Sequence, residues 1–177
     1  SIKDIELKNI KLLNKINIIY RNNRKSENID KLLKFRKECK IKKINFYITN
    51  NIKLASILKA DGIYISSYNR DLRLAKYKAS KYKIIGSAHN IKELNIKILQ
   101  GCTDILFSRL FETSYAYKKG SLGVIKFNLL SLTRKENILP LGGINLSKIN
   151  KLSMVKSNSF AILSEVKKKP AIISRLF

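Results

Sequence analysis

Histidine and cysteine are scarce in this sequence, and their scarcity excludes several kinds of site. The chain contains one histidine, His89, and two cysteines, Cys39 and Cys102, which lie far apart. A zinc centre built from cysteine and histidine alone needs more such residues, so we exclude one. We expect the two thiols to be buried and reduced, as in proteins of the cytosol.

Long apolar runs are also absent. No stretch approaches the roughly 20 consecutive apolar residues that a membrane helix needs. The first ten residues, SIKDIELKNI, are charged and lack the apolar centre of a signal peptide. We therefore expect a cytoplasmic protein with no membrane partner. Since 177 residues with an apolar fraction of 45% suffice for one core, we expect a single domain over residues 1–177.

Acidic residues are few, and the resulting charge raises the question of a polyanionic partner. Aspartate and glutamate number 12 against 37 lysines and arginines, which gives a formal net charge of +25. A basic nucleic-acid-binding module is one interpretation of such a charge. However, the lysines are dispersed, and the chain is rich in Ile, Lys and Asn, whose codons are rich in A and T. We therefore expect weak, salt-dependent binding of polyanions but no specific nucleic-acid partner.

Short apolar runs alternate with longer amphipathic ones along the chain, which is the pattern of repeated βα units. The expected strands cover residues 16–20, 44–49, 62–67, 83–88, 104–108, 137–143 and 160–164. The expected helices cover residues 27–40, 52–60, 70–82, 90–100, 124–132 and 146–155. Repeated βα units predict a parallel sheet, which at this number of units forms either a barrel or a doubly wound sheet.

The expected strand ends favour the barrel. They carry small or polar residues, namely Arg21, Thr49, Ser66, Ser87, Ser108, Gly142 and Ser164. In a (β/α)8 TIM barrel, the functional site is built at the carboxyl ends of the strands. We therefore predict an α/β protein with the (β/α)8 TIM-barrel fold.

Two glycines stand side by side in LPLGGIN (139–145), although the chain has only seven glycines. Without a Cβ atom, Gly142 and Gly143 would let a ligand approach the backbone. Together with Ser164 in FAILSEV (160–166), they are typical of the phosphate site near the last two strands of such barrels. The alternative is a tight strand-to-helix turn with Ser164 as a helix cap. On the ligand interpretation, Gly143→Val would abolish binding and leave the fold intact.

Read in order, these segments resemble the thiamine phosphate synthase/TenI family from about residue 16 to the C-terminus. NNIKLASILKADGIYIS (50–66) is similar to the family's Asn-Asp pair, helix and Ala-Asp-Gly strand, and IIGSAHNIKEL (84–94) to its Ile-Gly and Ser-x-His segment. DILFSRLFETS (104–114) resembles the strand that ends in Phe-x-Thr, and LPLGGIN and FAILSEV resemble the last two strands. The order and spacing carry the resemblance, because no single segment is specific.

The resemblance implies a (β/α)8 barrel with a role in thiamine biosynthesis. Thiamine phosphate synthases couple hydroxymethylpyrimidine diphosphate with a thiazole phosphate and release pyrophosphate with Mg²⁺, whereas TenI-type members isomerise the thiazole phosphate without metal. The expected partners are therefore small phosphorylated thiazole and pyrimidine substrates. A metal-free tautomerase or a non-catalytic thiazole-phosphate binder is the alternative to a synthase.

On this resemblance, the thiazole-phosphate side of the site is well kept. Gly143 and Ser164 fall where family members hold that phosphate, and Thr113 falls on the threonine near the thiazole. We include Gly142 and Ser87, which stand at expected strand ends, among the residues that bind substrate or phosphate.

The pyrophosphate side is eroded. The family's Gln-x-Arg-x-Lys strand end keeps only its arginine, Arg21, and the Asn-Asp pair reads Thr49 and Asn50. The threonine and lysine that follow Phe-x-Thr are both replaced, although Lys118 lies close by. We expect Arg21, Thr49 and Lys118 to contact substrate or its phosphates.

The metal side is eroded as well. Asn50 and Asn69 occupy the positions of two family carboxylates but carry no charge, whereas Mg²⁺ prefers anionic oxygens. We expect Mg²⁺ as a cofactor only if synthase activity survives, and Asp71 would substitute only after a shift of its loop. No catalytic residue is assigned, because Arg109 replaces the tautomerase histidine and stays protonated, and His89 stands at a different strand end.

The resemblance also leaves one strand unaccounted for. INIIYRN (16–22) aligns with the second strand of the family, and residues 1–14 take the place of the first helix. Either the sequence is a trimmed piece or the barrel is open by one strand. A parallel barrel that lacks a strand exposes two edges, which favours association. We therefore expect a barrel without its first strand. Whether the chain associates as a homo-oligomer is left open at this point.

Overall fold

The computed structural model describes residues 7, 10, 16–21, 28–79, 82–113 and 120–163. Within these residues, six parallel strands form one sheet in consecutive order: β1 (Asn17–Tyr20), β2 (Asn45–Thr49), β3 (Gly62–Ile65), β4 (Lys83–Ala88), β5 (Asp104–Ser108) and β6 (Asn137–Leu141). A single parallel bridge between Leu141 and Ala161 stands where the seventh strand was predicted. The consecutive order confirms the barrel prediction, because a doubly wound sheet reverses its strand order.

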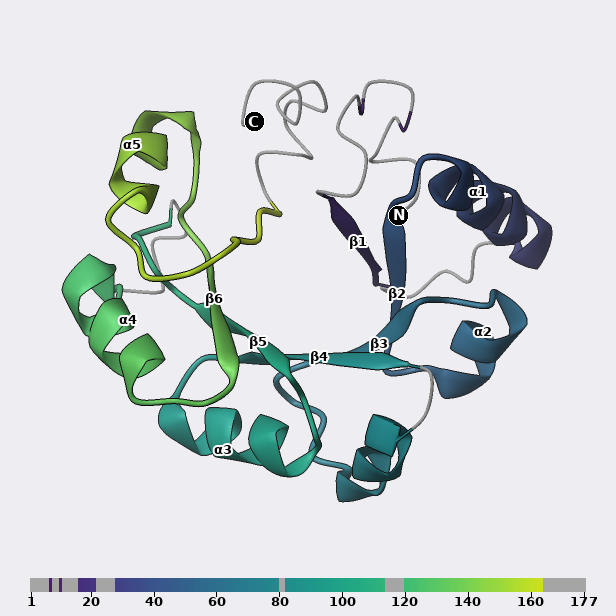
Figure 1. Ribbon diagram of the computed structural model, residues 1–177, viewed down its shortest axis with the longest axis horizontal. Coiled ribbons are helices and arrows are strands. Elements are labelled where there is room, and N and C mark those ends of the chain that lie inside the picture. Colours follow the sequence, from purple (N-terminus) through teal and green to yellow (C-terminus); the bar gives the residue numbers. More distant parts are fainter. Residues whose placement is uncertain are drawn as a thin grey trace.

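The sheet curls into a half-barrel with the helices on its outer side (Figure 1). The helices are α1 (Ile29–Ile41), α2 (Ile52–Ile57), η3 (Leu72–Ala79), α3 (Ile91–Leu99), α4 (Gly123–Leu132), η4 (Leu146–Lys148) and α5 (Ile149–Leu152). Each described strand from β1 to β6 is thus followed by helix, as the βα pattern predicts. The loops that follow the strands therefore gather at the carboxyl edge of the sheet.

Two predicted helices differ from expectation. The segment expected at 70–82 forms the 3₁₀ helix η3. At its start, Leu74 N donates a hydrogen bond to Asp71 O at 3.3 Å, which is the i to i+3 pattern of such a helix. The segment expected at 146–155 divides into η4 and the short helix α5. Asn145 caps η4, because its side-chain oxygen accepts a hydrogen bond from Lys148 N at 3.1 Å.

The core has two layers. Tyr47, Tyr64, Ile85, Leu106 and Leu139, one from each of β2 to β6, form a cluster of buried residues. Strand neighbours such as Phe46 and Ile63 point to the other face of the sheet and join the larger core that includes helix residues. All four residues of β3 are buried, as expected for a parallel strand that is covered on both faces.

The start of the sheet is compatible with the predicted loss of a first strand. β1 pairs with β2 alone, and no strand precedes β1 in the part of the chain that the structure describes. Leu7 and Ile10 are buried in the core, and Ile10 O accepts a hydrogen bond from Lys42 Nζ at 3.2 Å. The rest of residues 1–14, predicted to replace the first helix, lies outside the described residues.

Both cysteines are buried and free, as the sequence predicts. Burial raises the pKa of the Cys39 thiol to about 12 and that of the Cys102 thiol to about 12 as well. Because the thiolate is the reactive form, these two side chains serve as small apolar core groups.

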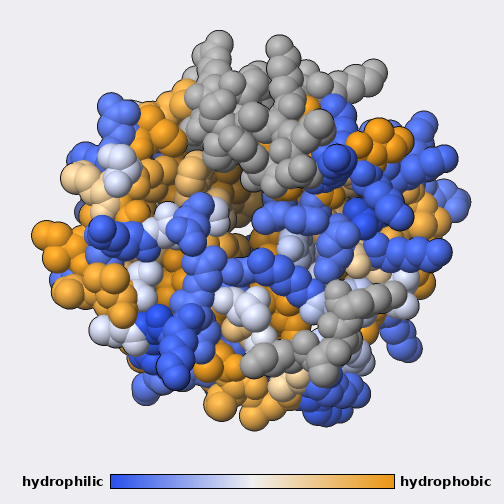
Figure 2. All heavy atoms as spheres, viewed as in Figure 1, coloured by the Kyte–Doolittle hydropathy of each residue, from blue (hydrophilic) through white to orange (hydrophobic). Residues whose placement is uncertain are grey.

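The surface is strongly hydrophilic over the middle of the face shown in Figure 2, with apolar side chains gathered towards its margins. This distribution agrees with the 37 lysines and arginines of the sequence. None of the helices in the described ranges has the length and apolar character needed to cross a membrane.

Candidate functional site

A cleft of about 940 Å³ opens at the carboxyl ends of β5 and β6. Its walls come from the loop after β5, the start of α4, the turn after β6 and the residues around Ala161. Arg21, after β1, and His89, after β4, also line it. The cleft thus lies at the edge of the sheet, near the last strands, where the sequence predicts the site.

The turn after β6 is bonded to the loop after β5. Leu110 N donates to Leu141 O at 3.0 Å, and Phe111 N donates to Gly142 O at 3.1 Å. The backbone of the turn then passes through two left-handed conformations, with φ of +92° at Gly142 and +71° at Gly143. Glycine adopts this region without the strain that a Cβ atom brings, so the turn requires both residues.

The same loop explains why a side chain is excluded at these positions. A Cβ atom on Gly143 would lie 2.3 Å from Phe111 O and 2.6 Å from Glu112 O, and one on Gly142 would lie 2.8 Å from Arg109 Cγ. The loop after β5 therefore fills the space beside these glycines that the sequence interpretation reserved for a ligand. This corrects the expectation that Gly143→Val would leave the fold intact, because valine would meet backbone atoms there.

Positive charge dominates the described lining of the cleft. Glu112 is the one carboxylate among these residues, against the four cationic side chains Arg21, Arg109, Lys126 and Lys148. Arg109 Nη1 donates to Thr113 Oγ1 at 3.2 Å, and Lys148 Nζ donates to Glu112 O at 3.2 Å. Concave sites lined by one sign of charge concentrate counter-ions, so this cleft suits an anionic ligand.

Four predicted ligand residues line the cleft, namely Arg21, Thr113, Gly142 and Gly143. Thr49 and Ser87 do not. Thr49 Oγ1 donates to Tyr20 O at 2.7 Å, and Ser87 is buried and forms a hydrogen bond with the Tyr64 side chain. A role for these two in ligand binding stays a prediction, and the geometry of the cleft lends it no support. Lys118 and Ser164 lie outside the described residues.

Asn50 and Asn69, which the sequence analysis predicts to occupy two former metal positions, are in direct contact. Asn69 Nδ2 donates to Asn50 Oδ1 at 3.1 Å, and the same oxygen accepts a hydrogen bond from Ser66 N at 3.1 Å. Asn50 Nδ2 in turn donates to Ser66 Oγ at 2.6 Å and to Tyr68 OH at 3.2 Å. Both ends of the Asn50 amide are therefore engaged within the protein.

This arrangement does not fit Mg²⁺. Asn50 Oδ1 already accepts two N–H groups, and Asn69 Oδ1 accepts a hydrogen bond from Asp71 N at 2.9 Å. Neither amide supplies the negative charge that this ion prefers in its ligands. Within the described ranges, no three of the residues His, Cys, Asp and Glu converge on one point.

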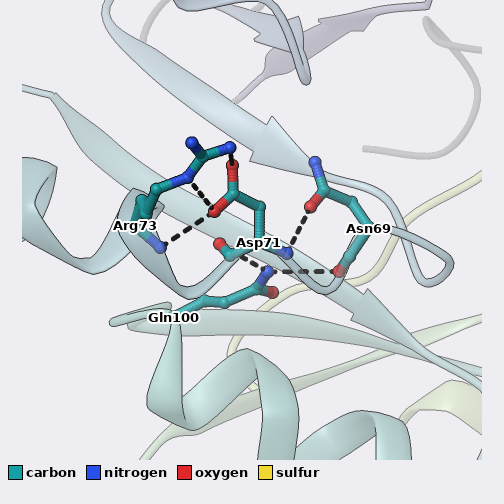
Figure 3. A network of polar contacts seen from close by, with 4 residues as sticks. All are labelled: Asn69, Asp71, Arg73 and Gln100. Atoms are coloured by element: carbon teal, nitrogen blue, oxygen red, sulfur yellow. Dashed lines mark hydrogen bonds and ion pairs between the residues drawn. The ribbon is translucent and has the colours of Figure 1, made fainter.

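Asp71 does not replace the lost carboxylates, because it is paired with Arg73 (Figure 3). Arg73 Nε donates to Asp71 Oδ1 at 2.8 Å and Nη2 donates to Oδ2 at 2.9 Å, which is a bidentate ion pair. These hydrogen bonds hold the pKa of Asp71 below its ordinary value. A loop shift that brought Asp71 to the position of Asn69 would have to break this pair.

A fully buried lysine lies behind the same loop, and the sequence interpretation missed it. Lys97, in α3, donates from Nζ to Asn69 O at 2.5 Å and to Gln100 Oε1 at 2.7 Å. Gln100 Nε2 donates to Asn69 O and to Asp71 O, both at 3.1 Å (Figure 3). Burial lowers the pKa of Lys97 to about 8. The two side chains together hold the main chain of the loop after β3.

Three cationic residues of the cleft were also not predicted as ligand residues. Arg109 had a usable signal, because it directly follows the strand expected at 104–108 and such positions face the site of a barrel. Lys126 and Lys148 carry no such signal, because each is one of many lysines on helical segments. Their position in the cleft depends on how α4 and η4 pack.

Consecutive parallel strands, outer helices and a cationic cleft at the carboxyl edge define a β/α-barrel-type protein suited to an anionic ligand. The sequence model of the family described as "Thiamine monophosphate synthase" matches residues 11–166. The chain therefore belongs to this family, which confirms the resemblance noted from the sequence.

Curated relatives agree with this assignment. The thiamine-phosphate synthase of Pelagibacter ubique is 34% identical over 146 residues, which cover 78% of this chain and 69% of that protein. A thiamine-phosphate synthase of Prochlorococcus marinus is 29% identical over 153 residues, which cover 85% of this chain but 40% of that protein. The chain thus spans only about 40% of the length of the Prochlorococcus relatives that it matches.

Solved structures show the same fold. Thiamine phosphate pyrophosphorylase from Pyrococcus furiosus superposes with a TM-score of 0.66 at 15% identity, over 91% of this chain and 81% of that chain. The 3-keto-L-gulonate-6-phosphate decarboxylase of Vibrio cholerae gives 0.57 at 14% identity, over 85% and 78% of the two chains. At these identities the likeness concerns the fold alone.

Proposed function

We propose that the chain binds a thiazole phosphate in the cleft and couples it with hydroxymethylpyrimidine diphosphate, releasing pyrophosphate, as a thiamine-phosphate synthase-like transferase. The observation that carries this proposal is the cationic cleft at the carboxyl ends of β5 and β6, where Thr113 and the Gly142–Gly143 turn lie beside four cationic side chains. The thiamine-phosphate synthases among its relatives support the same chemistry.

The chemistry needs positive charge at defined places. When the pyrimidine is transferred, its bond to the diphosphate breaks and negative charge develops on the leaving group, which positioned cations stabilise. Arg21, at the end of β1, falls on the arginine that the resemblance assigns to the pyrophosphate side, and it lines the cleft. In the proposal, Arg21 faces the diphosphate and the residues near Gly142 face the thiazole phosphate.

The direct test is an assay for thiamine phosphate formed from both substrates, with and without Mg²⁺. We expect product only when both substrates are present, detected by chromatography as its fluorescent oxidation product. Omission of either substrate serves as the control. If no product forms in either buffer, the transferase proposal is wrong, and calorimetry with the thiazole phosphate then shows whether the cleft binds it.

A non-catalytic or tautomerase-like protein that binds thiazole phosphate is the second candidate. The hydrogen-bonded Asn50–Asn69 pair favours it, because the residues at the two metal positions do not fit Mg²⁺. The guanidinium group of Arg109 does not supply a proton-transfer group, which favours the binder over the tautomerase. Binding of the thiazole phosphate without any turnover would identify the binder.

A further inference from the structure

Helix α4 is apolar on nearly every side, although it lies in the outer layer of the half-barrel (Figure 1). An outer helix is expected to turn apolar residues to the sheet and polar residues to solvent, whereas a helix that is apolar all round is expected to be buried. In α4, Phe127 is buried, and Val124 and Leu130 pack against the core. The core therefore uses only part of the apolar residues of this helix.

The other apolar residues of α4 form one exposed stripe. Ile125, Leu129 and Leu132 are exposed at 78%, 61% and 70%. Because they follow one another at intervals of four and three residues, they lie on one face of the helix. Figure 2 shows apolar side chains gathered at the left margin of the molecule, where α4 lies. Contiguous exposed apolar patches with a polar rim mark sites of interaction with proteins or membranes.

Met154 borders this stripe. Asn128 Nδ2 donates a hydrogen bond to Met154 O at 2.8 Å, which holds the segment after α5 against α4. The Met154 side chain is exposed at 56%. Since Asn128 directly precedes Leu129 on the helix, the methionine lies at the edge of the stripe. We call the four residues Ile125, Leu129, Leu132 and Met154 the α4 patch.

The surroundings of the α4 patch are cationic. Three exposed lysines flank it, namely Lys126 in α4, Lys135 after the end of α4, and Lys156. Lys156 is held against the helix, because its carbonyl oxygen accepts a hydrogen bond from Ser131 Oγ at 3.1 Å. Glu136 is the one carboxylate among the described residues 120–163, which hold six lysines and arginines. The patch is thus an uncharged centre with a positive rim.

This charge decides which surface fits the α4 patch. In a contact between two copies of the chain across a two-fold axis, the same surface lies on both sides, so the two cationic rims would meet. Like charges that meet at an interface cost free energy. The patch also lacks the aromatic residues and arginine in which the cores of protein interfaces are enriched. An anionic membrane offers both complements, because it has negative headgroups for the lysines and acyl chains for the apolar side chains.

We propose that the α4 patch binds reversibly to an anionic lipid membrane, with its apolar side chains among the acyl chains and the flanking lysines against the headgroup phosphates. The inference goes beyond the proposed function, because it concerns where the protein is held rather than the chemistry of the cleft. It replaces the expectation of no membrane partner, which came from the lack of a long apolar run. A helix that lies on a membrane needs no such run.

Co-sedimentation of the full chain with lipid vesicles tests the proposal. The vesicles contain phosphatidylcholine alone, or phosphatidylcholine and phosphatidylglycerol in equal parts, at about 150 mM salt, which screens distant charges. The parent protein should bind the anionic vesicles and not the neutral ones. Ile125→Ser with Leu129→Ser should weaken this binding about tenfold or more, because two aliphatic groups no longer enter the membrane.

A matched control separates the α4 patch from exposed apolar residues in general. Ile57→Ser with Leu99→Ser makes the same two substitutions at the ends of α2 and α3, where these side chains are exposed at 52% and 64%. This variant should bind the anionic vesicles as the parent does. Far-ultraviolet circular dichroism of every variant checks that the fold is kept.

A second pair of variants tests the cationic rim. Lys135→Gln with Lys156→Gln should weaken binding to the anionic vesicles by about tenfold, because each lysine near an anionic surface contributes to binding. Lys31→Gln with Lys37→Gln removes the same charge from exposed positions of α1 and should have a smaller effect. Equal losses from the two pairs would show that the rim does not face the lipid.

A fluorescent label reports the insertion directly. Both native cysteines are buried, so Leu129→Cys adds one accessible thiol to which an environment-sensitive dye can be attached. Its emission should move to shorter wavelength when anionic vesicles are added. The same dye at Leu99→Cys, on α3, should not respond.

Several results would overturn the proposal. Absence of binding to anionic vesicles would do so, and so would equal binding by the parent and both serine variants, because charge alone would then hold the protein. A dimer of the parent in light scattering that Ile125→Ser with Leu129→Ser abolishes would assign the face to a second copy instead. The assay for thiamine phosphate is carried out without lipid, so its result is separate from these.

Discussion

Asn69 Nδ2 donates a hydrogen bond to Asn50 Oδ1 at 3.1 Å, so a pair of neutral amides joins the loops after β2 and β3. The double variant Asn50→Asp with Asn69→Asp would place two carboxylates in contact. Like charges at this distance raise the pKa of one group unless a cation lies between them. We therefore expect Mg²⁺ to bind the double variant in calorimetry without substrate, and to bind the parent negligibly.

A second double variant controls for added charge. Asn28 and Asn150 are exposed and lie on other elements, so Asn28→Asp with Asn150→Asp adds the same two charges away from the amide pair. It should bind Mg²⁺ no better than the parent. Firm Mg²⁺ binding by the parent protein would show that the alignment of the metal positions is wrong.

The close approach at Gly143 predicts a loss of stability on substitution. Gly143→Ala places a Cβ atom 2.3 Å from Phe111 O at a φ of +71°, whereas Gly120→Ala has a φ of +88° but no neighbouring atom within 4 Å. The left-handed conformation alone costs about 1–2 kcal/mol, and overpacking adds about 1–3 kcal/mol. Urea denaturation should therefore show a larger loss of unfolding free energy for Gly143→Ala. Equal losses would mean that the loop yields to the new atom.

The buried lysine predicts a dependence of stability on pH. Burial lowers the pKa of Lys97 from its ordinary value of 10.5 to about 8 in the folded protein, so the unfolded chain binds more protons between these two pH values. The unfolding free energy of the parent, relative to Lys97→Met, should therefore rise with pH through this window. The slope should stay below about 1.4 kcal/mol per pH unit, the value for one full proton.

Denaturation of both proteins at a series of pH values from 7 to 10.5 measures this difference. Lys92→Met, which changes an exposed lysine of α3, is the control and should follow the parent. A difference between the parent and Lys97→Met that does not change with pH would contradict the predicted titration of Lys97.

The net charge of +25 predicts weak binding to nucleic acids that is independent of their sequence. Binding of labelled duplexes, followed by fluorescence anisotropy, should fall steeply between about 50 and 200 mM salt, because phosphate contacts release counter-ions. Duplexes of unrelated sequence should bind equally. A sequence preference that persists at the higher salt concentration would favour the nucleic-acid-binding alternative.

Features set by neighbours in the chain were predictable. Helix α3 begins at its cap Asn90, whose side chain accepts a hydrogen bond from Glu93 N at 2.9 Å, and Gly101 follows its end with a φ of +79°. Both signals lie within a few residues of the helix ends that they set. The prediction of a helix at 70–82 was less accurate. Contacts from outside this segment act there, because Gln100, from another βα unit, donates hydrogen bonds to the main chain at Asn69 and Asp71.

The polar residues at the strand ends also combine a feature that the sequence predicts with one that it does not. Thr49 and Ser87 were correctly placed at the ends of strands, but each bonds to a neighbouring strand rather than lining the cleft. Only the pairing of the strands shows which polar side chain meets a neighbour and which remains at the cleft.

The sequence by itself determined the order of the parallel strands and the edge at which the cleft opens, because both follow from the repeating βα pattern and its crossovers. The tertiary structure decided what each side chain at that edge contacts. The space beside Gly143 holds Phe111 and Glu112, and Lys148 reaches Glu112 across 36 residues of chain. Such contacts depend on distances between loops that are far apart in sequence, which spacing along the chain does not encode.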